Sequence, residues 1–214
     1  MTDSGYPILA REGWWHTGLA VAAALLIHFF VGYAWAIPFW ILAAFIIQFF
    51  RDPPRQCPEL LDAVICPADG KIIAQGEVDD PFLQRRAKRV SIFMNVFDVH
   101  SNRIPVTGKV QERWYSKGKF INASLDKASS DNERNALWIK TDQGQDVVVV
   151  QVAGLIARRI LCYVEPGERV TRGARYGFIR FGSRVDVYLP LNAHFRASLG
   201  DKVKGAADVI AQLT

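Results

Sequence analysis

The chain has 214 residues, 50% of them hydrophobic, and a formal net charge of +5, which allows one substantial domain with an appendage. Its three cysteines contain no CxxC pair, which excludes a zinc-binding spacing and a disulfide framework and favours a reducing compartment. Basic residues gather at 85–89 and 158–159 without interleaved aromatic residues, so we expect an anionic membrane surface as partner and no nucleic acid.

An uncharged hydrophobic run over residues 17–50 follows a short N-terminal segment, 1–16. As one helix, its 34 residues would measure about 51 Å against a hydrocarbon core of about 30 Å. Two full spans would need about 20 residues each, slightly more than the run supplies. Gly32 and Pro38 mark a break near its middle. The run therefore predicts a membrane helical hairpin, either spanning or re-entrant.

Positive charges flank this run on both sides, with Arg11 before it and Arg51 and Arg55 after it. The positive-inside tendency then places both ends, and the domain that follows, on the cytoplasmic side of the cell membrane. A helical pair buried in a soluble core is the alternative. A secretory signal peptide is disfavoured by the length of the run and by the lack of a small-residue cleavage site.

From residue 51 to 214 the pattern changes to short apolar alternations separated by Gly, Pro and Asp. This pattern predicts a mainly β (α+β) domain. Strands are expected at 63–66, 70–77, 89–93, 108–114, 136–141, 145–152, 159–164, 177–181 and 184–189. Two further turn-and-strand segments, 167–173 and 200–205, resemble the hairpin elements of biotinyl and lipoyl carrier domains. A carrier would present a lysine on its hairpin, whereas this chain has Gly182-Ser183-Arg184 at the comparable position.

The dipeptide Gly182-Ser183 lies inside a strand-like run over residues 175–190. A glycine in a strand usually marks a bulge or a close backbone approach. A serine hydroxyl held against the preceding carbonyl can attack it as an internal nucleophile. Because Gly-Ser pairs are also common in turns, the dipeptide alone does not distinguish a reactive bond from a structural one.

Two other segments carry polar groups that suit such chemistry. Asp69 lies in a tight Asp-Gly turn, and His100 and Arg103 follow an apolar strand. Each has a structural explanation, a turn residue in one case and a hydrogen-bonded strand end in the other. Together with Ser183 they supply the serine, histidine and carboxylate that activate a hydroxyl, provided that the fold brings them together.

Four stretches resemble the phosphatidylserine decarboxylase family in its short bacterial or archaeal form: PADG at 67–70, FDVHSNRIPVTG at 97–108, GKFINASLDKASSDNERN at 118–135 and FGSRVDVYLP at 181–190. The resemblance covers nearly the whole chain. It implies a proenzyme that cuts itself at Gly182-Ser183 into a beta chain, 1–182, and an alpha chain, 183–214, which stay associated. It also implies a covalent pyruvoyl group derived from Ser183 as the cofactor, and no metal.

The chemistry that this resemblance implies begins with attack of Ser183 Oγ on the Gly182 carbonyl, which replaces the amide by an ester. Elimination frees the Gly182 carboxylate, and the resulting dehydroalanine loses ammonia to become the pyruvoyl group. That ketone would form a Schiff base with phosphatidylserine and accept electrons as carbon dioxide leaves, giving phosphatidylethanolamine. A membrane lipid is thus expected both as the substrate and as the environment of the enzyme. A homodimer is a further expectation.

Longer members of the family have two histidines three residues apart, which align here with His100 and Arg103. An arginine cannot act as a base at neutral pH, so the base for self-cleavage is open. We predict that His100 activates Ser183 and later returns a proton to the substrate, and that Asp69 orients His100. Arg103 is predicted to bind the substrate carboxylate or phosphate.

Three further residues complete the prediction. Lys127 and Asn132, in the loop over residues 118–135, are expected to contact the lipid headgroup. His194 competes with His100 as the base, since the other histidines lie in or beside the hydrophobic run.

Other functions remain open at this stage. The lipid substrate could be an archaeal archaetidylserine, because the reacting headgroup is the same. A pyruvoyl decarboxylase of a soluble amino acid would not need the hydrophobic hairpin. A non-enzymatic, membrane-anchored biotinyl-like module would keep Ser183 as an ordinary serine and would show no cut on denaturing electrophoresis.

Overall fold

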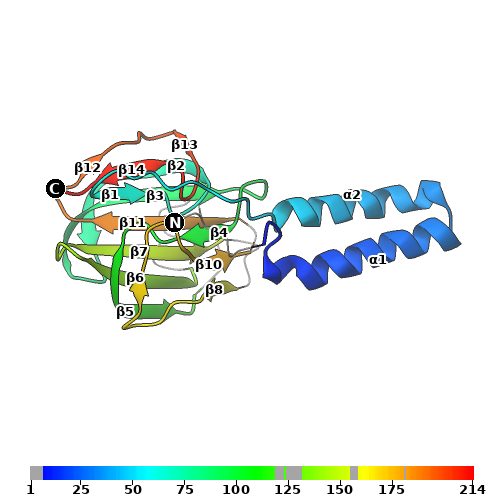
Figure 1. The fold of residues 1–214 in the computed structure, drawn as a ribbon, viewed down its shortest axis with the longest axis horizontal. Helices are drawn as coiled ribbons and strands as arrows, with labels where there is room; N and C mark the ends of the chain where they lie inside the picture. Colours follow the sequence, from blue (N-terminus) through cyan, green and yellow to red (C-terminus); the bar gives the residue numbers. More distant parts are fainter. Residues whose placement is uncertain (1–6, 119–122, 124–131, 155–158, 181) are drawn as a thin grey trace. The chain divides into compact units, whose positions relative to one another are not determined.

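The computed structural model describes residues 7–118, 123, 132–154, 159–180 and 182–214 (Figure 1). The chain divides into two compact units, a helical unit that ends at Pro54 and a β unit over Arg55–Thr214. Each unit is described by itself. The boundary lies within the Pro-rich stretch that follows the hydrophobic run.

The helical unit consists of a 3-10 turn, η1 (Arg11–Gly13), and two helices, α1 (Trp14–Phe30) and α2 (Tyr33–Phe49). The chain reverses at Gly32, whose φ of 123° favours glycine. Pro38 lies inside α2 and does not interrupt it, so of the two predicted break points only the glycine is one. Each helix has 17 residues, which corresponds to about 25 Å.

The surfaces of both helices are apolar and largely exposed within this unit. Large side chains such as Trp15, Phe30 and Trp35 are more than two thirds exposed. The segment Arg11–Phe30 is long and apolar enough to cross a membrane, whereas α2 is shorter. The predicted helical pair is confirmed, with α1 beginning three residues before the predicted start at Thr17. Its exposed apolar surface is a hint of membrane association.

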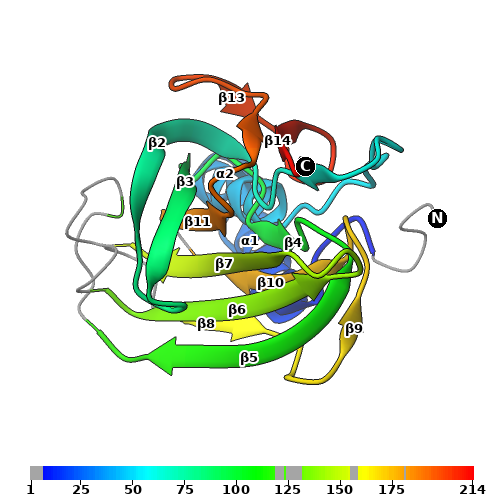
Figure 2. The same cartoon turned by 90° about the vertical axis from the view of Figure 1, so that its left-hand side faces the viewer.

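The main sheet of the β unit has eight strands in the order β13-β2-β3-β11-β7-β6-β5-β9, and it curls strongly (Figure 2). Its pairings are antiparallel. The strands are β2 (Gly70–Asp80), β3 (Arg85–Met94), β5 (Gly108–Ser116), β6 (Arg134–Thr141), β7 (Asp146–Ala153), β9 (Arg169–Val170), β11 (Ser183–Leu189) and β13 (Lys202–Val203).

Two three-stranded sheets accompany the main sheet. One has the order β4-β10-β8 and is formed by β4 (Ser101–Arg103), β10 (Arg175–Ile179) and β8 (Ile160–Cys162). The other has the order β1-β14-β12 and is formed by β1 (Ala63–Ile65), β14 (Val209–Gln212) and β12 (His194–Phe195).

The core covers both faces of the central strands. The larger cluster gathers residues such as Met94, Val149 and Val185, and a smaller cluster on the other face includes Val150 and Tyr188. Because both faces are covered, β11 is buried along its whole length and β7 along all but its first residue. Their valine-rich sequences follow from this burial, since branched apolar side chains pack well in a strand.

The mainly β (α+β) class and all nine predicted strands are confirmed. The strands missed by the sequence prediction are short, β4, β9, β12, β13 and β14, although β9 and β13 fall within the two predicted turn-and-strand segments. The two strands predicted within the run 175–190 belong to different sheets, as β10 and β11. The placement of Gly182-Ser183 inside a strand was wrong. Gly182, with a φ of 57°, forms the bend before β11, so the dipeptide begins a strand and is not inside one.

Candidate active site

The residues predicted to carry the chemistry meet at one end of the eight-stranded sheet. There β11 begins at Ser183, which pairs with Met94 at the end of β3 and with Ala153 at the end of β7. On the far side of β3, β2 begins at Gly70. Neighbouring strands lie about 4.8 Å apart, so the ends of β3 and β7 flank position 183 directly, and β2 begins one strand further away.

Ser183 has a side chain that is fully buried. Among the residues that the structure describes, its Oγ has no hydrogen-bond partner. A buried hydroxyl without a partner costs about 1–3 kcal/mol, and such groups in native structures call for an explanation. The left-handed bend at Gly182 directly precedes it. This hydroxyl therefore contributes no hydrogen bond to the described fold.

Asp69 lies in the turn that leads into β2. Its carboxylate pairs with Arg55 at 2.8 Å and accepts a hydrogen bond from the Gly205 backbone N–H at 2.8 Å. Burial raises the pKa of this carboxyl above its usual value, although Arg55 and the Gly205 N–H oppose the rise, and Asp98 adds to it. Asp98 precedes His100 by two residues, so the segment that leads to His100 is close enough to Asp69 for this electrostatic effect.

His100 is fully buried, and its Nδ1 lies 2.9 Å from the carbonyl oxygen of Asp98. A carbonyl oxygen can only accept a hydrogen bond, so Nδ1 carries a proton, and in the neutral form of the ring Nε2 would be the nitrogen with the lone pair. Two residues further on, the Asn102 amide donates to Met94 Sδ at 3.8 Å. Because Met94 pairs with Ser183, the segment that begins with His100 lies at the same end of the sheet.

Two other predicted residues are buried in internal contacts. Arg103 donates to the Gly173 carbonyl at 3.4 Å, and its backbone N–H donates to Pro67, just before Asp69. Asn132 donates its amide to the Ala153 carbonyl at 2.7 Å, which holds the end of β7 beside Ser183. Their roles in substrate binding stay predictions.

Of the last two predicted residues, one falls outside the described part of the chain and the other lies away from Ser183. Lys127 lies outside the described residues. His194 is on β12, which follows the Leu189 end of β11 and lies near the start of β3, where Lys88 donates to the Ala193 carbonyl. His194 and Ser183 therefore lie near opposite ends of β11.

A buried ion pair that the sequence prediction missed directly follows Ser183. Arg184 and Asp186 form two contacts, Nε to Oδ1 at 2.9 Å and Nη2 to Oδ2 at 3.1 Å, and both side chains are almost completely buried. Arg184 also donates to the carbonyl of Ala123 at 3.1 Å. An Arg-x-Asp pattern in an otherwise apolar strand could have indicated it, because residues two apart share a face.

A polar cavity of about 330 Å³ lies close to this end of the sheet. It is lined by Arg113, Tyr115, Glu133, Asn135, Arg159, Ile160, Leu161 and Cys162. The Glu133 carbonyl accepts a hydrogen bond from the Ala153 N–H, so the cavity begins two strands away from Ser183. Tyr115 donates to the buried Glu133 carboxylate at 2.9 Å, whereas Arg159 is exposed. The cavity thus offers groups of both charges.

Burial and the Glu133 carboxylate raise the pKa of Tyr115, and the positive charge of Arg159 opposes that rise. The phenol therefore stays protonated at neutral pH and remains a donor to Glu133. Arg159 lines the same cavity as the Tyr115–Glu133 pair.

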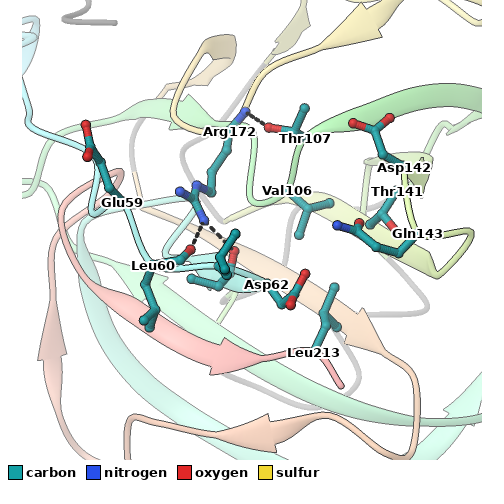
Figure 3. A pocket seen from close by; sticks show the side chains of 12 residues that line it. Glu59, Leu60, Asp62, Val106, Thr107, Thr141, Asp142, Gln143, Arg172 and Leu213 are labelled. Atoms are coloured by element: carbon teal, nitrogen blue, oxygen red, sulfur yellow. Dashed lines mark hydrogen bonds between the residues drawn. The ribbon is translucent and has the colours of Figure 1, made fainter.

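A second cavity, of about 280 Å³, lies at the opposite end of β6, beside Thr141 (Figure 3). Arg172 points into it and donates to the Leu60 and Ala63 carbonyls at 2.6 and 3.4 Å, while its backbone N–H donates to Thr107. These bonds fasten the segment before β1 to the rest of the β unit. We assign this cavity a structural role, since it is remote from Ser183.

Among the described residues, no group of three or more His, Cys, Asp or Glu could hold a metal ion. Cys57, Cys66 and Cys162 are free thiols. Burial raises the pKa of the Cys66 thiol, which donates to the Ala68 carbonyl at 2.9 Å.

Comparison with known proteins connects this geometry to one family. Residues 42–211 match the family model described as phosphatidylserine decarboxylase. The chain is 60% identical over 207 residues to a protein of Nitrosomonas europaea named phosphatidylserine decarboxylase proenzyme, covering 97% of this chain and 96% of that protein. Proteins of the same name from Aromatoleum aromaticum and Burkholderia mallei are 58% and 56% identical over 208 residues, covering 97% of this chain and 97% and 96% of theirs.

Proposed function

Because the chain belongs to the phosphatidylserine decarboxylase family, we propose that it cuts itself between Gly182 and Ser183 and then converts phosphatidylserine to phosphatidylethanolamine and carbon dioxide. The observation that carries the proposal is the Ser183 hydroxyl, buried and without a hydrogen-bond partner among the described residues, directly after the bend at Gly182. A hydroxyl in this position is available to attack the carbonyl that precedes it.

Self-cleavage needs a proton acceptor for this hydroxyl. In the proposed step Ser183 Oγ forms a bond to the Gly182 carbonyl carbon, its proton passes to His100 Nε2, and the amide nitrogen leaves the carbonyl, taking that proton to become an amine. The product is an ester. Elimination then removes the Cα proton of residue 183 and breaks the bond between Oγ and Cβ, which frees the Gly182 carboxylate and leaves a dehydroalanine. Water adds to the imine tautomer of this dehydroalanine, and ammonia leaves.

The pyruvoyl group made in this way would supply an electrophilic ketone that accepts the substrate amine and draws electrons from the carboxyl-bearing carbon. The surroundings of position 183 fit such a group, because it is small and Ser183 uses its oxygen for no described hydrogen bond. Met94 and Ala153 flank it from the neighbouring strands. His100 Nε2 then returns a proton to the substrate carbon that loses the carboxyl group.

The strand pairing supports the association of the two fragments. Residues 183–214 contain β11, β12, β13 and β14. β11 pairs with β3 on one side and β7 on the other, β13 pairs with β2, and β14 pairs with β1. A cut before Ser183 therefore leaves the alpha chain held in the middle of the main sheet.

We propose that the polar cavity beside β6 takes the lipid headgroup. The headgroup carries a carboxylate and a phosphate as well as the amine, and guanidinium groups recognise both anions. Arg159 is exposed at this cavity, which lies close to the Ser183 end of the sheet. Arg103, Lys127 and Asn132 remain proposed contacts from the sequence, as does Asp69 for the orientation of His100. The hydrophobic helices would hold the enzyme at the cell membrane, with the β unit on the cytoplasmic side.

Intact-mass measurement of the purified protein tests the proposal. We expect two fragments, 1–182 and 183–214, the second lighter by one ammonia than its sequence requires. The Ser183→Ala variant should give one uncut chain and no phosphatidylethanolamine. Wild-type protein that releases carbon dioxide from phosphatidylserine while it remains a single full-length chain would contradict self-cleavage.

A further inference from the structure

Gly154, directly after the end of β7, faces the carbonyl group that self-cleavage attacks. An ideal Cβ built on Gly154 would overlap the carbonyl oxygen of Gly182 and would lie 2.8 Å from its carbonyl carbon. Non-bonded carbon atoms are normally 3.5–4.0 Å apart. The two strands therefore approach each other here more closely than any side chain at position 154 would permit.

Glycine is required at the two positions of this contact for different physical reasons. Gly182 has a φ of 57°, and a Cβ built on it would meet nothing within 4 Å, so its backbone conformation explains the residue type. Gly154 is not one of the described glycines that have a positive φ. Space for the Gly182 carbonyl is thus the reason for glycine at position 154.

A side chain at position 154 would also be crowded by Ala123. The Ala123 Cβ lies 3.4 Å from the position that a Gly154 Cβ would occupy. The buried Arg184 holds Ala123 in turn, by donating to its carbonyl at 3.1 Å. Asp186 fixes that guanidinium through two contacts. A Cβ at position 154 therefore has little room to avoid the Gly182 carbonyl by shifting toward Ala123.

We propose that Gly154 is a positioning residue for self-cleavage: the absence of its side chain lets the Gly182 carbonyl adopt the orientation in which Ser183 Oγ can attack it. This inference rests on the proposed self-cleavage. A methyl group at position 154 would have to displace the carbonyl by on the order of 1 Å, and a misplacement of that size costs about 100-fold in rate.

Gly108 provides a matched control at the other end of the sheet. A Cβ on Gly108 would overlap the Lys140 carbonyl oxygen and lie 2.9 Å from its carbon, nearly the same clash with a backbone carbonyl. Gly108 pairs with Thr141, whereas the Ser183 end of β6 is at Arg134. Gly154→Ala and Gly108→Ala therefore impose similar strain at different distances from the Gly182 carbonyl.

The experiment follows newly made full-length chains by pulse labelling and denaturing electrophoresis, with wild type and Ser183→Ala as references. We expect Gly154→Ala to form the 183–214 fragment about 100-fold more slowly than wild type, or not at all. Gly108→Ala should form it at a rate within a few-fold of wild type. Cutting of Gly154→Ala at the wild-type rate would overturn the inference and leave the proposed function intact.

Stability is measured separately, with both glycine substitutions placed in the uncut Ser183→Ala background and compared by thermal unfolding. If Gly154 had only a structural role, the loss of cutting would follow the loss of stability in both variants alike. The proposal instead requires that cutting be lost at Gly154 alone, even when both variants are destabilised equally. Equal loss of cutting in both variants would overturn it. An uncut wild type would defeat the proposed function itself and the inference with it.

Discussion

The two ends of the eight-stranded sheet differ in how they accommodate polar groups. At the Ser183 end, Ser183, His100 and Arg184 are buried. At the end near the β2–β3 turn, ion pairs such as Arg86–Asp79 are exposed to solvent. Burying polar groups costs free energy, whereas surface pairs contribute little. The buried polar side chains, whose burial costs free energy, therefore lie at the end where the chemistry is expected.

The largest effect at the Ser183 end is expected for His100→Ala. If His100 is both the base for cleavage and the later proton donor, this variant should remain an uncut chain, with decarboxylation reduced by about 10²–10⁴-fold or lost. Electrophoresis and carbon dioxide release measure the two steps separately. A chain that is cut at the normal rate but is inactive would assign the base for cleavage to another residue.

A smaller effect at the same end is expected for Arg159→Gln. Removal of the cation at the polar cavity should weaken headgroup binding by about tenfold, the factor that corresponds to about 1.4 kcal/mol. The variant should still cut itself. Binding of phosphatidylserine vesicles to the uncut Ser183→Ala chain measures this directly, with Arg169→Gln as the control at an arginine paired with Asp142 on the surface. Equal binding by both variants would rule the cavity out as the headgroup site.

Asp69 should make stability depend on pH. Burial raises its folded-state pKa above the unfolded value of about 3.9, so between these two values the folded chain binds more protons than the unfolded chain. Stability contributed by the protonated carboxyl is therefore present below about pH 3.9 and is lost as the pH rises through the folded-state pKa. Unfolding of Ser183→Ala with and without Asp69→Asn should show that this decline disappears in the Asn variant. Identical pH profiles would contradict the shift.

The smallest effect is expected at the opposite end, for Arg86→Gln. Arg86 contacts Glu77 at 3.6 Å and Asp79 at 3.4 Å, and all three side chains are more than half exposed. Its removal should change the free energy of unfolding by less than about 1 kcal/mol and leave self-cleavage unaffected. Urea unfolding and electrophoresis check both points. A marked loss of cutting in this variant would remove the contrast between the two ends.

The structure places the basic cluster at 85–89 at the end of the sheet away from Ser183. These residues begin β3, and Met94 ends it beside Ser183. A strand of this length spans about 30 Å. Arg85 and Arg86 pair with nearby acidic residues such as Asp80 and Glu77. Of the two basic clusters in the sequence, the second, through Arg159, therefore lies nearer to the site, and the membrane role of the first stays a prediction.

Much of the fold could be predicted from local patterns. Alternating apolar residues predicted the long strands, and an uncharged run predicted the helical pair, because both signals repeat over many residues. The short strands, such as β12 and β14, were missed because two to four residues carry too little periodicity. The bend at Gly182 was placed inside a strand-like run, since the residues on both sides of it are strand formers.

The amino-acid order by itself determined which bond is expected to break, the apolar helices and the strand-rich unit that follows them, since each depends on residues adjacent in the chain. Only the tertiary structure decided that Gly154 faces the Gly182 carbonyl, that Arg184 and Asp186 are buried together, and that a polar cavity opens two strands from Ser183. These features depend on the register between β7 and β11 and on the way that β6 extends the sheet. Register arises from the packing of the whole core, and no local pattern encodes it.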